Sequence, residues 1–427
     1  MAPVKLPEPE LMRLLAALLS LLIASQVLGG LFQRWRQPRV IGEIAGGLLF
    51  GPTVLGALAP DAHHALFAAS SAEKQVLGFV FWLGLMLLMF CSGLETRSAV
   101  NRTEWRTTLW LTATGTVLPL LAGFWVAGAV DFSPWFGPRA TRLTFALILA
   151  NALAVTSIPV IGKILFDVGL TGTSFARVVL TTAMIEDMAL WVMLSVTLGL
   201  ASVETASPFA IARGILVTMG YFAFCQVLGH RIYDGISRAR WNPFKTAADG
   251  MPVLLVFMVT VLLAYLLGVN PIFGAFLAGR VVASSERIAA TTRDQIKGFS
   301  FAFFIPAYFA SVGLQLDLRH DFDLGLFGGI LLGACAIKAA SVYLGARLAA
   351  HPHATGVDLA IAMNARGGPG IVLATVALNA GLITGGFQAI LILLSLVTSQ
   401  IAGWWLQRPS VREALVREAH GREAPVT

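Results

Sequence analysis

Long apolar runs follow one another along almost the whole chain, and each is about as long as the roughly 20 residues that a helix needs to cross a bilayer. We count about thirteen such runs on this length criterion. They begin near the following residues: Leu11, Val40, Val76, Thr107, Leu143, Ala176, Ala210, Pro252, Ile272, Phe299, Leu324, Val357 and Phe387. The runs lack the strict alternation of a β-barrel strand, which favours helices. The sequence therefore predicts an all-α polytopic membrane protein.

The composition agrees with this class. Hydrophobic residues make up 57% of the 427 residues and charged residues only 12%, whereas a soluble domain carries about 25% charged residues. The net charge of +7 raises the question of nucleic-acid binding. The arginines, however, lie in short segments between apolar runs, where they indicate membrane topology. We therefore expect membrane lipid, and no nucleic acid, as a partner.

Positive charge alternates between successive loops. One set is rich in arginine and lysine, and it comprises residues 34–39, 97–106, 231–245, 280–297, Arg347 and the tail 407–427. The alternate loops hold few such residues, namely Lys74, Arg139, Arg142 and Arg319. The positive-inside rule places the first set in the cytoplasm. With an odd number of crossings, the N-terminal tail 1–10 is then outside and the C-terminal tail 407–427 inside.

Two short motifs recur along the chain. Residues Pro38–Gly46 resemble Pro271–Gly279, and Phe90–Glu95 resemble Phe309–Leu314. Members of each pair are seven apolar runs apart, and an odd offset gives the two copies opposite orientations in the membrane. Inverted repeats are typical of secondary transporters, which bind their substrate at the repeat interface. Chance recurrence of glycine-rich helix contacts is the alternative explanation.

The repeat predicts how the chain is divided. We expect six helices in each repeat and one helix between them. The predicted segments are 11–203 for the first repeat, 207–250 for the linker helix with a cytoplasmic loop, and 251–406 for the second repeat.

Helix-breaking residues lie in the middle of two runs that are also seven apart. The fifth run contains Asn151–Pro159, with Pro159 as its breaker, and the twelfth contains Asn364–Gly370. The breakers of the twelfth run are Gly367, Gly368, Pro369 and Gly370. Proline removes a backbone donor, and glycine lowers the cost of non-helical angles. We expect two discontinuous helices that cross at mid-membrane and offer carbonyls and half-helix ends to an ion. A simple proline kink is the alternative at Pro159.

Two acidic residues, Glu186 and Asp187, stand side by side within the apolar run 178–201. An acid at mid-membrane costs about 2.5–3.5 kcal/mol on insertion scales, and such residues usually mark substrate or proton pathways. The pair therefore predicts a site that takes up and releases cations or protons, with Asp187 as the ligand of a monovalent cation. A structural ion pair is the alternative for either carboxylate.

Polar residues in other runs complete the candidate site. Lys338 lies at the centre of the run 326–348, and a buried ammonium needs a partner. Glu186 and Asp187 are the natural candidates, and Arg366 is a second cation for these acids. Thr156 and Ser157 offer oxygen ligands, although hydroxyls bonded to their own helix are an equal alternative. A third acid, Glu43, is expected to pair with an interfacial arginine.

Taken in order, these motifs resemble the cation/proton antiporter superfamily. The resemblance covers about residues 11–406 and is closest to the bacterial branch of glutathione-gated potassium efflux proteins and spore-germination-type sodium antiporters. It is carried by the following stretches: Gln37–Glu43, Gly51–Gly56, Phe90–Glu95, Thr156–Pro159, Gly274–Gly279 and Pro306–Leu314. Because the sequence ends soon after the last run, we expect no cytosolic nucleotide-binding domain of the kind found in the potassium efflux proteins.

The resemblance implies a fold, an assembly and a location. It implies two inverted repeats with crossed discontinuous helices, and a core domain that moves like an elevator against a dimerisation domain. It also implies a homodimer in the bacterial cytoplasmic (inner) membrane. Asp187 matches the ion-binding aspartate, and Lys338 matches the lysine that faces the acidic pair in electrogenic sodium members. Glu186 and Gly368 depart from the family pattern, which often has Asp or Gln at the first position and an acid at the second.

The function predicted from these features is secondary active exchange of Na⁺ or K⁺ for protons, with no cofactor beyond the transported ions. If Lys338 releases a proton when the cation binds, two protons exchange per cation and the exchange is electrogenic. A proton-driven exporter of an organic cation or metabolite on the same fold is the alternative, and a pore-type channel is another. An enzyme is not expected, because all seven histidines lie in loops or tails and no catalytic cluster occurs in an apolar run.

Overall fold

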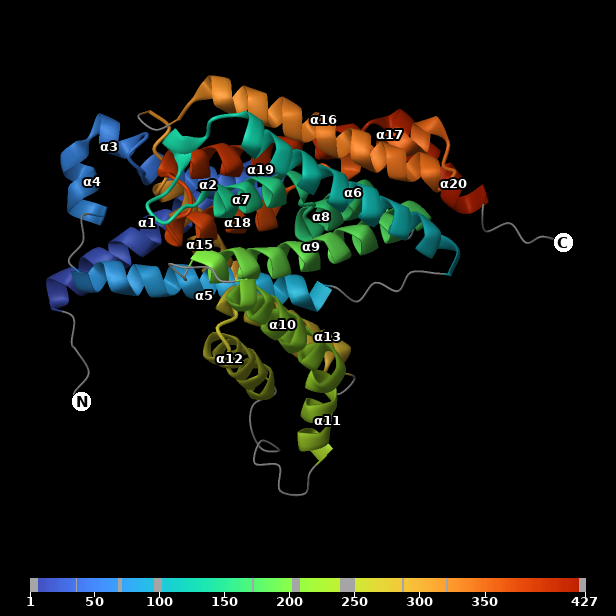
Figure 1. The fold of residues 1–427 in the computed structure, drawn as a ribbon. Coiled ribbons are helices and arrows are strands. Elements are labelled where there is room, and N and C mark those ends of the chain that lie inside the picture. Colours follow the sequence, from blue (N-terminus) through green and yellow to red (C-terminus); the bar gives the residue numbers. More distant parts are fainter. Residues whose placement is uncertain are drawn as a thin grey trace. The chain divides into compact units, whose positions relative to one another are not determined.

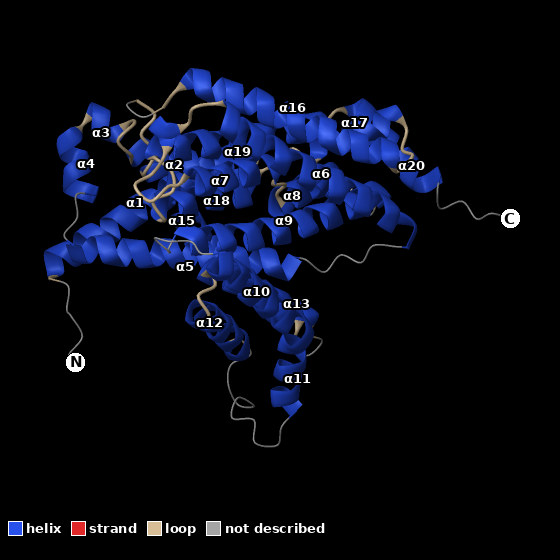
Figure 2. Ribbon diagram, in the orientation of Figure 1, coloured by secondary structure: helices blue, strands red, loops and turns tan. Residues whose placement is uncertain are grey.

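The computed structural model describes residues 7–35, 37–67, 71–95, 102–170, 173–201, 208–238, 250–285, 288–319 and 322–421. Within these residues the regular structure is helical, apart from one isolated antiparallel bridge between Phe136 and Ile383. Figure 2 shows helices joined by short loops. The predicted all-α class is confirmed.

Ten helices in the described part of the chain are long and apolar enough to cross a membrane. Three further apolar helices are shorter, and they are Arg142–Ala154, Met251–Leu266 and Pro271–Ser284. All of these helices lie where the sequence places apolar runs. The protein is therefore a multi-pass membrane protein, and the count of about thirteen crossings stays a prediction.

The chain forms two compact units, each assembled from separate stretches of sequence. Unit 1 comprises Met1–Leu94, Gln226–Leu263 and Gly274–Phe322, and unit 2 comprises Glu95–Cys225, Ala264–Phe273 and Asp323–Thr427. The two units are sets of residues that lie close together in space. The predicted segments 11–203, 207–250 and 251–406 instead follow the internal sequence repeat, so the two divisions describe different properties. The predicted repeat boundaries remain a proposal.

Unit 1 is built around close helix contacts at glycines. It holds all or most of α1 (Glu8–Arg34), α2 (Arg39–Phe50), α3 (Leu55–Leu58), α4 (Pro60–Phe67), α5 (Ser71–Glu95), the π-helix η2 (Cys225–Gly229), α11 (His230–Arg238), α12 (Met251–Leu266), α13 (Pro271–Ser284), α14 (Ala290–Phe299), the π-helix η3 (Ser300–Phe304) and α15 (Ile305–Leu314) (Figure 1). A Cβ atom added to Gly313 of α15 would lie 2.8 Å from the Leu48 nitrogen of α2. A Cβ atom on Gly93 of α5 would lie 3.0 Å from Cα of Gly279 in α13. The motif glycines thus allow backbone-to-backbone packing.

The third membrane acid of the sequence, Glu43, lies in unit 1 and has an ion-pair partner. Arg39 Nε lies 3.0 Å from Glu43 Oε1, one helical turn away on α2. Arg39 also donates to Gln26 of α1. The expectation that Glu43 pairs with an arginine is confirmed, and the interfacial position of Arg39 stays a prediction.

Unit 2 contains every predicted site residue. Its helices are α6 (Arg102–Ala129), the short 3₁₀-helix η1 (Ser133–Trp135), α7 (Arg142–Ala154), α8 (Ile158–Val168), α9 (Ser174–Ala201), α10 (Pro208–Phe224), α16 (Leu324–Leu348), α17 (His353–Ala362), α18 (Gly367–Asn379), α19 (Gly385–Leu406) and α20 (Pro409–Gly421). The pairs α7/α8 and α17/α18 are each separated by three or four non-helical residues.

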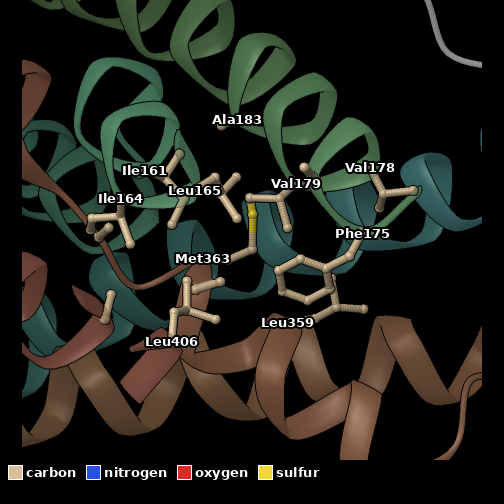
Figure 3. Close-up of a cluster of buried hydrophobic side chains, with 14 of the residues drawn as sticks. Ile161, Ile164, Leu165, Phe175, Val178, Val179, Ala183, Leu359, Met363 and Leu406 are labelled. Carbon is tan, nitrogen blue, oxygen red and sulfur yellow. The ribbon is translucent and has the colours of Figure 1, made fainter. Parts of the chain in front are cut away.

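A cluster of buried apolar side chains in unit 2 holds the helices that carry the site (Figure 3). Phe175, Val179 and Ala183 form one stripe of α9 at a spacing of four residues, and they are buried together with Leu165 of α8 and Leu359 of α17. Water does not drive helices together inside a bilayer, so close packing of such side chains provides the attraction. The cluster fixes α8 and α9 against α17.

Candidate functional site

The two interrupted helix pairs of unit 2 meet backbone to backbone. The backbone N–H of Ser157 donates to the Ala365 carbonyl over 2.6 Å. The Thr156 hydroxyl donates to the Met363 carbonyl, also over 2.6 Å. Each non-helical segment therefore satisfies polar groups of the other, which is what backbone buried in a membrane protein requires.

The predicted helix breakers lie in the first turn of the second helix of each pair, α8 or α18. They are not among the non-helical residues that separate the two helices of a pair. Pro159 is the second residue of α8, and Gly367 is the first of α18, followed by Gly368, Pro369 and Gly370. Proline is well accommodated there because the first-turn N–H groups lack helical partners anyway. Gly367 has φ +39°, a conformation that other residues rarely adopt.

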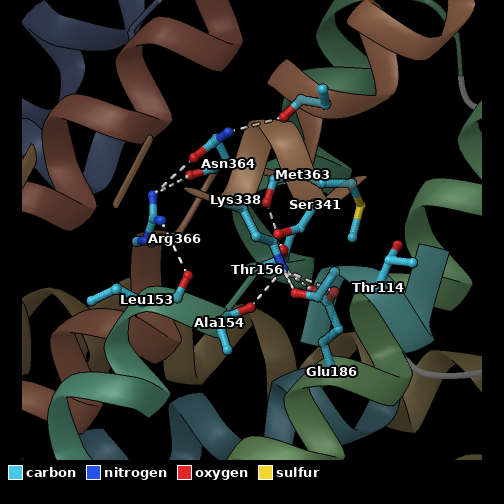
Figure 4. A network of polar contacts seen from close by, with 12 residues as sticks. Thr114, Leu153, Ala154, Thr156, Glu186, Lys338, Ser341, Met363, Asn364 and Arg366 are labelled. Atoms are coloured by element: carbon cyan, nitrogen blue, oxygen red, sulfur yellow. Dashed lines mark hydrogen bonds and ion pairs between the residues drawn. The ribbon is translucent and has the colours of Figure 1, made fainter. Parts of the chain in front are cut away.

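The C-terminal end of α7 is covered by two buried cations (Figure 4). Lys338 Nζ donates to the Ala154 carbonyl over 2.6 Å. Arg366 donates from Nε to the Ala152 carbonyl over 3.1 Å and from Nη2 to the Leu153 carbonyl over 3.2 Å. The last carbonyls of a helix have no partner within it and carry partial negative charge. The interruption after α7 thus creates acceptors that these two side chains occupy.

Arg366 makes further hydrogen bonds to carbonyl oxygens. Nη2 donates to the Ala334 carbonyl over 3.0 Å, and Nη1 lies 3.1 Å from Asn364 Oδ1 and 3.3 Å from its backbone oxygen. The side chain is fully buried at 0% exposure. Its hydrogen bonds within the described residues include no carboxylate. Arg366 thus binds backbone carbonyls of α7 and α16 and the residue Asn364, and its charge acts on Glu186 without a direct hydrogen bond.

Lys338 and Glu186 form a buried ion pair, as the sequence suggested for one of the two acids. The Nζ atom lies 2.9 Å from Glu186 Oε1 and 2.8 Å from Oε2. It also donates to the Gly115 carbonyl of α6 over 2.9 Å. A Cβ atom on Gly115 would lie 2.9 Å from Glu186 Oε1, so the glycine lets the carboxylate approach the bare backbone of α6.

Asp187 differs sharply from its neighbour in its surroundings. It is 0% exposed, and by hydrogen-bond geometry neither carboxylate oxygen has a partner among the described residues. The backbone N–H of Ile158, at the positive end of α8, is close enough to favour its charge. One peptide group does not offset the several kcal/mol that burying an ionised carboxylate costs. Asp187 thus needs a proton or a cation.

The two predicted hydroxyl ligands are bonded in different ways. Thr156 Oγ1 uses its proton on Met363 of the other interrupted pair, and Ser157 Oγ accepts the N–H of Val160 over 3.4 Å at the start of α8. Thr156 is thus bonded across the crossing, whereas Ser157 is bonded within its own turn. Each oxygen keeps a lone pair that a hard cation prefers as a ligand.

Sequence reasoning missed several contributors to the site. Asn151 Nδ2 donates to the Leu190 carbonyl over 3.2 Å and joins α7 to α9. Ser399 of α19 accepts the Gly367 N–H over 3.1 Å. Asn151 had a signal, because it is an amide within an apolar run, while Ser399 and Gly115 had none. In the described part of the chain, no group of three or more His, Cys, Asp or Glu residues is arranged to hold a metal ion.

Comparison with known proteins finds a matching family and relatives that are all named as cation/proton exchangers or antiporters. The family model described as "Sodium/hydrogen exchanger, transmembrane" matches residues 17–412. The Na⁺/H⁺ antiporter NhaS4 of Synechocystis is 25% identical over 397 residues, which cover 92% of this chain and 95% of the relative. K⁺/H⁺ antiporter 1 of Saccharomyces cerevisiae is 28% identical over 385 residues, 86% of this chain but 43% of the relative.

A solved structure shares the fold. The sodium proton antiporter MjNhaP1 from Methanocaldococcus jannaschii, determined at pH 8, superposes with a TM-score of 0.69 at 16% sequence identity. The match covers 95% of this chain and 99% of that one. The likeness therefore extends over both units and supports the fold class.

Proposed function

The chain belongs to the sodium/hydrogen exchanger family, and from this premise we propose that it is a secondary active transporter that exchanges Na⁺ or K⁺ for protons. The observation that carries the proposal is the buried Asp187 carboxylate, which lacks a hydrogen-bond partner among the described residues beside two interrupted helix pairs. A relative is named for each of the two cations.

The proposed exchange follows from the cost of an uncompensated charge. A proton removes the charge of Asp187, and a monovalent cation balances it, so either ligand relieves the desolvation penalty. The same carboxylate does not hold both at once, and entry of one displaces the other. Thr156 and Ser157 are the side chains we propose to supply further oxygen ligands to the cation. No enzyme chemistry and no resident cofactor enter this cycle.

The other charged groups of the site are Lys338, Glu186 and Arg366, and we propose that they stay in place during exchange. Lys338 and Glu186 neutralise each other, and Arg366 holds the ends of α7 and α17 through carbonyls. We propose that these charge-compensating groups keep their contacts while Asp187 changes its ligand. This role is supported by their complete set of hydrogen bonds, in contrast to that of Asp187.

We extend the proposal to architecture and assembly. Contacts in unit 1 follow the pattern expected of a two-fold inverted repeat, because the second run packs on the tenth through Gly313 and the third on the ninth through Gly93 and Gly279. We propose an elevator-like core, a homodimer and the bacterial inner membrane with the N-terminus outside and the C-terminus inside. Membrane-impermeant labelling of single cysteines in the two tails tests the orientation.

The function is tested in proteoliposomes that contain a pH-sensitive dye. Adding Na⁺ or K⁺ outside is expected to drive protons out of the lumen in the wild type, and Asp187→Asn should abolish this flux. Asp294→Asn, outside unit 2, is the matched control and should transport normally. Normal exchange by the Asp187 variant would remove this carboxylate from the mechanism.

A second cargo is favoured by one observation. Gly368 is buried, yet a Cβ atom built on it would meet no atom within 4 Å. This position beside the crossing has room for at least one further carbon atom, and on this ground we propose proton-driven export of an organic cation or metabolite as the alternative. Proton flux stimulated by organic ammonium compounds but not by Na⁺ or K⁺ would favour it.

A further inference from the structure

We infer that α6 and α9 enclose a water-filled proton route, lined by threonine hydroxyls, that leads from the Glu104–Arg177 ion pair to Glu186. The inference rests on the proposed exchange of a cation for protons, and it adds where the proton travels. The two helices and both end points of this route lie in unit 2.

Two contacts fix how α6 and α9 run past each other. At one point Arg177 of α9 holds Glu104 of α6, with Nη2 2.5 Å from Oε1 and Nε 3.2 Å from Oε2. At the other point Glu186 lies against Gly115, and Lys338 bonds to both. The second point follows the first along both helices, so the helices run in the same direction. The points are about 15 Å apart, at 1.5 Å per residue.

The interval between these points contains buried hydroxyls without partners. Thr181 lies one turn after Arg177, and Thr182 lies one turn before Glu186. Thr112 lies two turns after Glu104. The Oγ1 atoms of Thr112, Thr181 and Thr182 are buried and make no hydrogen bond to any described residue, and the same holds for Thr116 beside Gly115.

Other threonines of the same two helices, two of them within this interval of α6, do hydrogen-bond to their own backbone. The hydroxyls of Thr108 and Thr114 in α6 donate to the carbonyl four residues earlier, over 3.2 Å and 2.8 Å. Thr197 of α9 does the same over 2.8 Å. A helical threonine always has this backbone acceptor within reach. The unpaired hydroxyls in the interval are therefore turned away from the backbone.

The chemistry of the interval selects water as its occupant. A buried hydroxyl without a partner costs about 1–3 kcal/mol, and water both donates and accepts, as a hydroxyl requires. A metal cation needs several oxygen ligands at once, and the interval also contains the buried apolar side chains Leu111 and Val178. A chain of water and hydroxyls passes protons by exchanging hydrogen bonds. The route ends at Glu186, the chain neighbour of Asp187, so the proton reaches Asp187 without passing Thr156 and Ser157.

The test removes hydroxyls while keeping side-chain shape. Thr181 and Thr182 are both replaced by Val in one variant and by Ser in another, and Thr197→Val is the control whose hydroxyl is already bonded to its own helix. Cation-driven proton flux is measured in proteoliposomes over a range of Na⁺ and K⁺ concentrations. We expect the double Val variant to lose about tenfold in maximal rate with an unchanged half-saturating cation concentration. The double Ser variant and the control should match the wild type.

Two results would overturn the inference. One is a wild-type maximal rate in the double Val variant, and the other is a raised half-saturating cation concentration at unchanged rate, which would make the hydroxyls cation ligands. If the wild type shows no cation-driven proton flux at all, the proposed function fails instead.

A second measurement needs no variant. Hydroxyl-radical labelling of the intact protein modifies buried side chains only where ordered water lies beside them. Leu111, at 0% exposure, and Val178, at 5%, are expected to be labelled. Leu359, buried at 1% in the same apolar cluster but away from the interval, should remain unlabelled. Absence of label on both Leu111 and Val178 would contradict a water-filled route.

Discussion

Arg366 and Lys338 donate to consecutive carbonyl groups at the end of α7, the guanidinium to Ala152 and Leu153 and the ammonium to Ala154. Both cations thus lie at the negative end of a half-helix that ends inside the membrane protein. The crossing of the interrupted helices is held by cations on carbonyls and not by packing alone, and its stability should depend on donor geometry.

The substitution Arg366→Lys tests this dependence. Lysine keeps the charge but lacks the planar set of five donors, so several buried carbonyls lose their partner at about 1–3 kcal/mol each. We expect a clear fall in the melting temperature of the purified protein and loss of exchange. Arg347→Lys is the control, because Arg347 also donates to a backbone carbonyl, that of His351, but at an exposed position. Equal effects of the two substitutions would contradict the argument.

The Lys338–Glu186 pair predicts strong coupling between its two members. Removing one partner of a buried ion pair leaves an uncompensated charge and costs about 3–5 kcal/mol. Lys338→Met and Glu186→Gln should each lower thermal stability strongly, and the double variant should be less destabilised than the two effects summed. A double-mutant cycle on melting measures this coupling. Additive losses would show that the pair contributes little as a pair.

Much of the fold was predictable because membrane burial leaves a clear pattern in sequence. A stretch such as Leu324–Leu348 is read from its length and lack of charge alone. Shorter helices such as α7, of 13 residues, were also predictable, because the breaker Pro159 explains why the run divides. The position of the interruption was less predictable. The non-helical residues precede the proline, since proline fits the first turn of the next helix.

The site was predictable in its charges but not in its backbone contacts. The cost of burying Lys338 called for an acid, and the structure supplies Glu186. The partners of Arg366 were not predictable, because they include the backbone carbonyls of Ala152 and Ala334. Every residue has such a carbonyl, so the residue type does not show which ones act as acceptors. Gly115 matters for the same reason: its missing side chain admits Glu186, and a glycine in a membrane helix is common.

Two adjacent glycines of α18 should respond in opposite ways to alanine. A Cβ atom on Gly367 would lie 2.8 Å from Cβ of Val160 and 2.9 Å from Ser157 Oγ, at a φ of +39°. A Cβ atom on Gly368 would meet no atom within 4 Å. Gly367→Ala should therefore disrupt the crossing and abolish exchange, whereas Gly368→Ala should fold and transport. Cation-driven flux and melting temperature measure both, and a disruptive Gly368→Ala would refute the open space.

Ala350 is a site where a substitution should increase stability. It follows α16 with φ 69°, the one described non-glycine residue with positive φ. Alanine in this conformation costs about 1–2 kcal/mol. Replacing it by glycine removes this cost, but glycine loses more conformational freedom on folding, which offsets part of the gain. Ala350→Gly should stabilise by up to about 1 kcal/mol, seen as a higher melting temperature. Ala349→Gly, where φ is −78°, is the control and should not stabilise.

The contacts of Lys338 predict the charge stoichiometry of the exchange. Besides Glu186, the ammonium has two backbone acceptors, Gly115 and Ala154. We expect these acceptors to hold its proton whatever ligand Asp187 carries. Asp187 is then the one group that trades a proton for a cation, so one proton should move per cation with no net charge. The opposite case, raised from the sequence, is an electrogenic exchange in which Lys338 releases a proton.

Electroneutral exchange is measured as sodium-driven proton flux in proteoliposomes under a thiocyanate diffusion potential. The rate should not change between potentials of opposite sign. A two-proton exchanger carries one net charge per cycle, and its driving force changes by about 2.3 kcal/mol per 100 mV. A rate that follows the potential would therefore show that Lys338 gives up its proton. The Lys338→Met variant would then be expected to lose that voltage dependence, whereas the Arg347→Lys control would retain it.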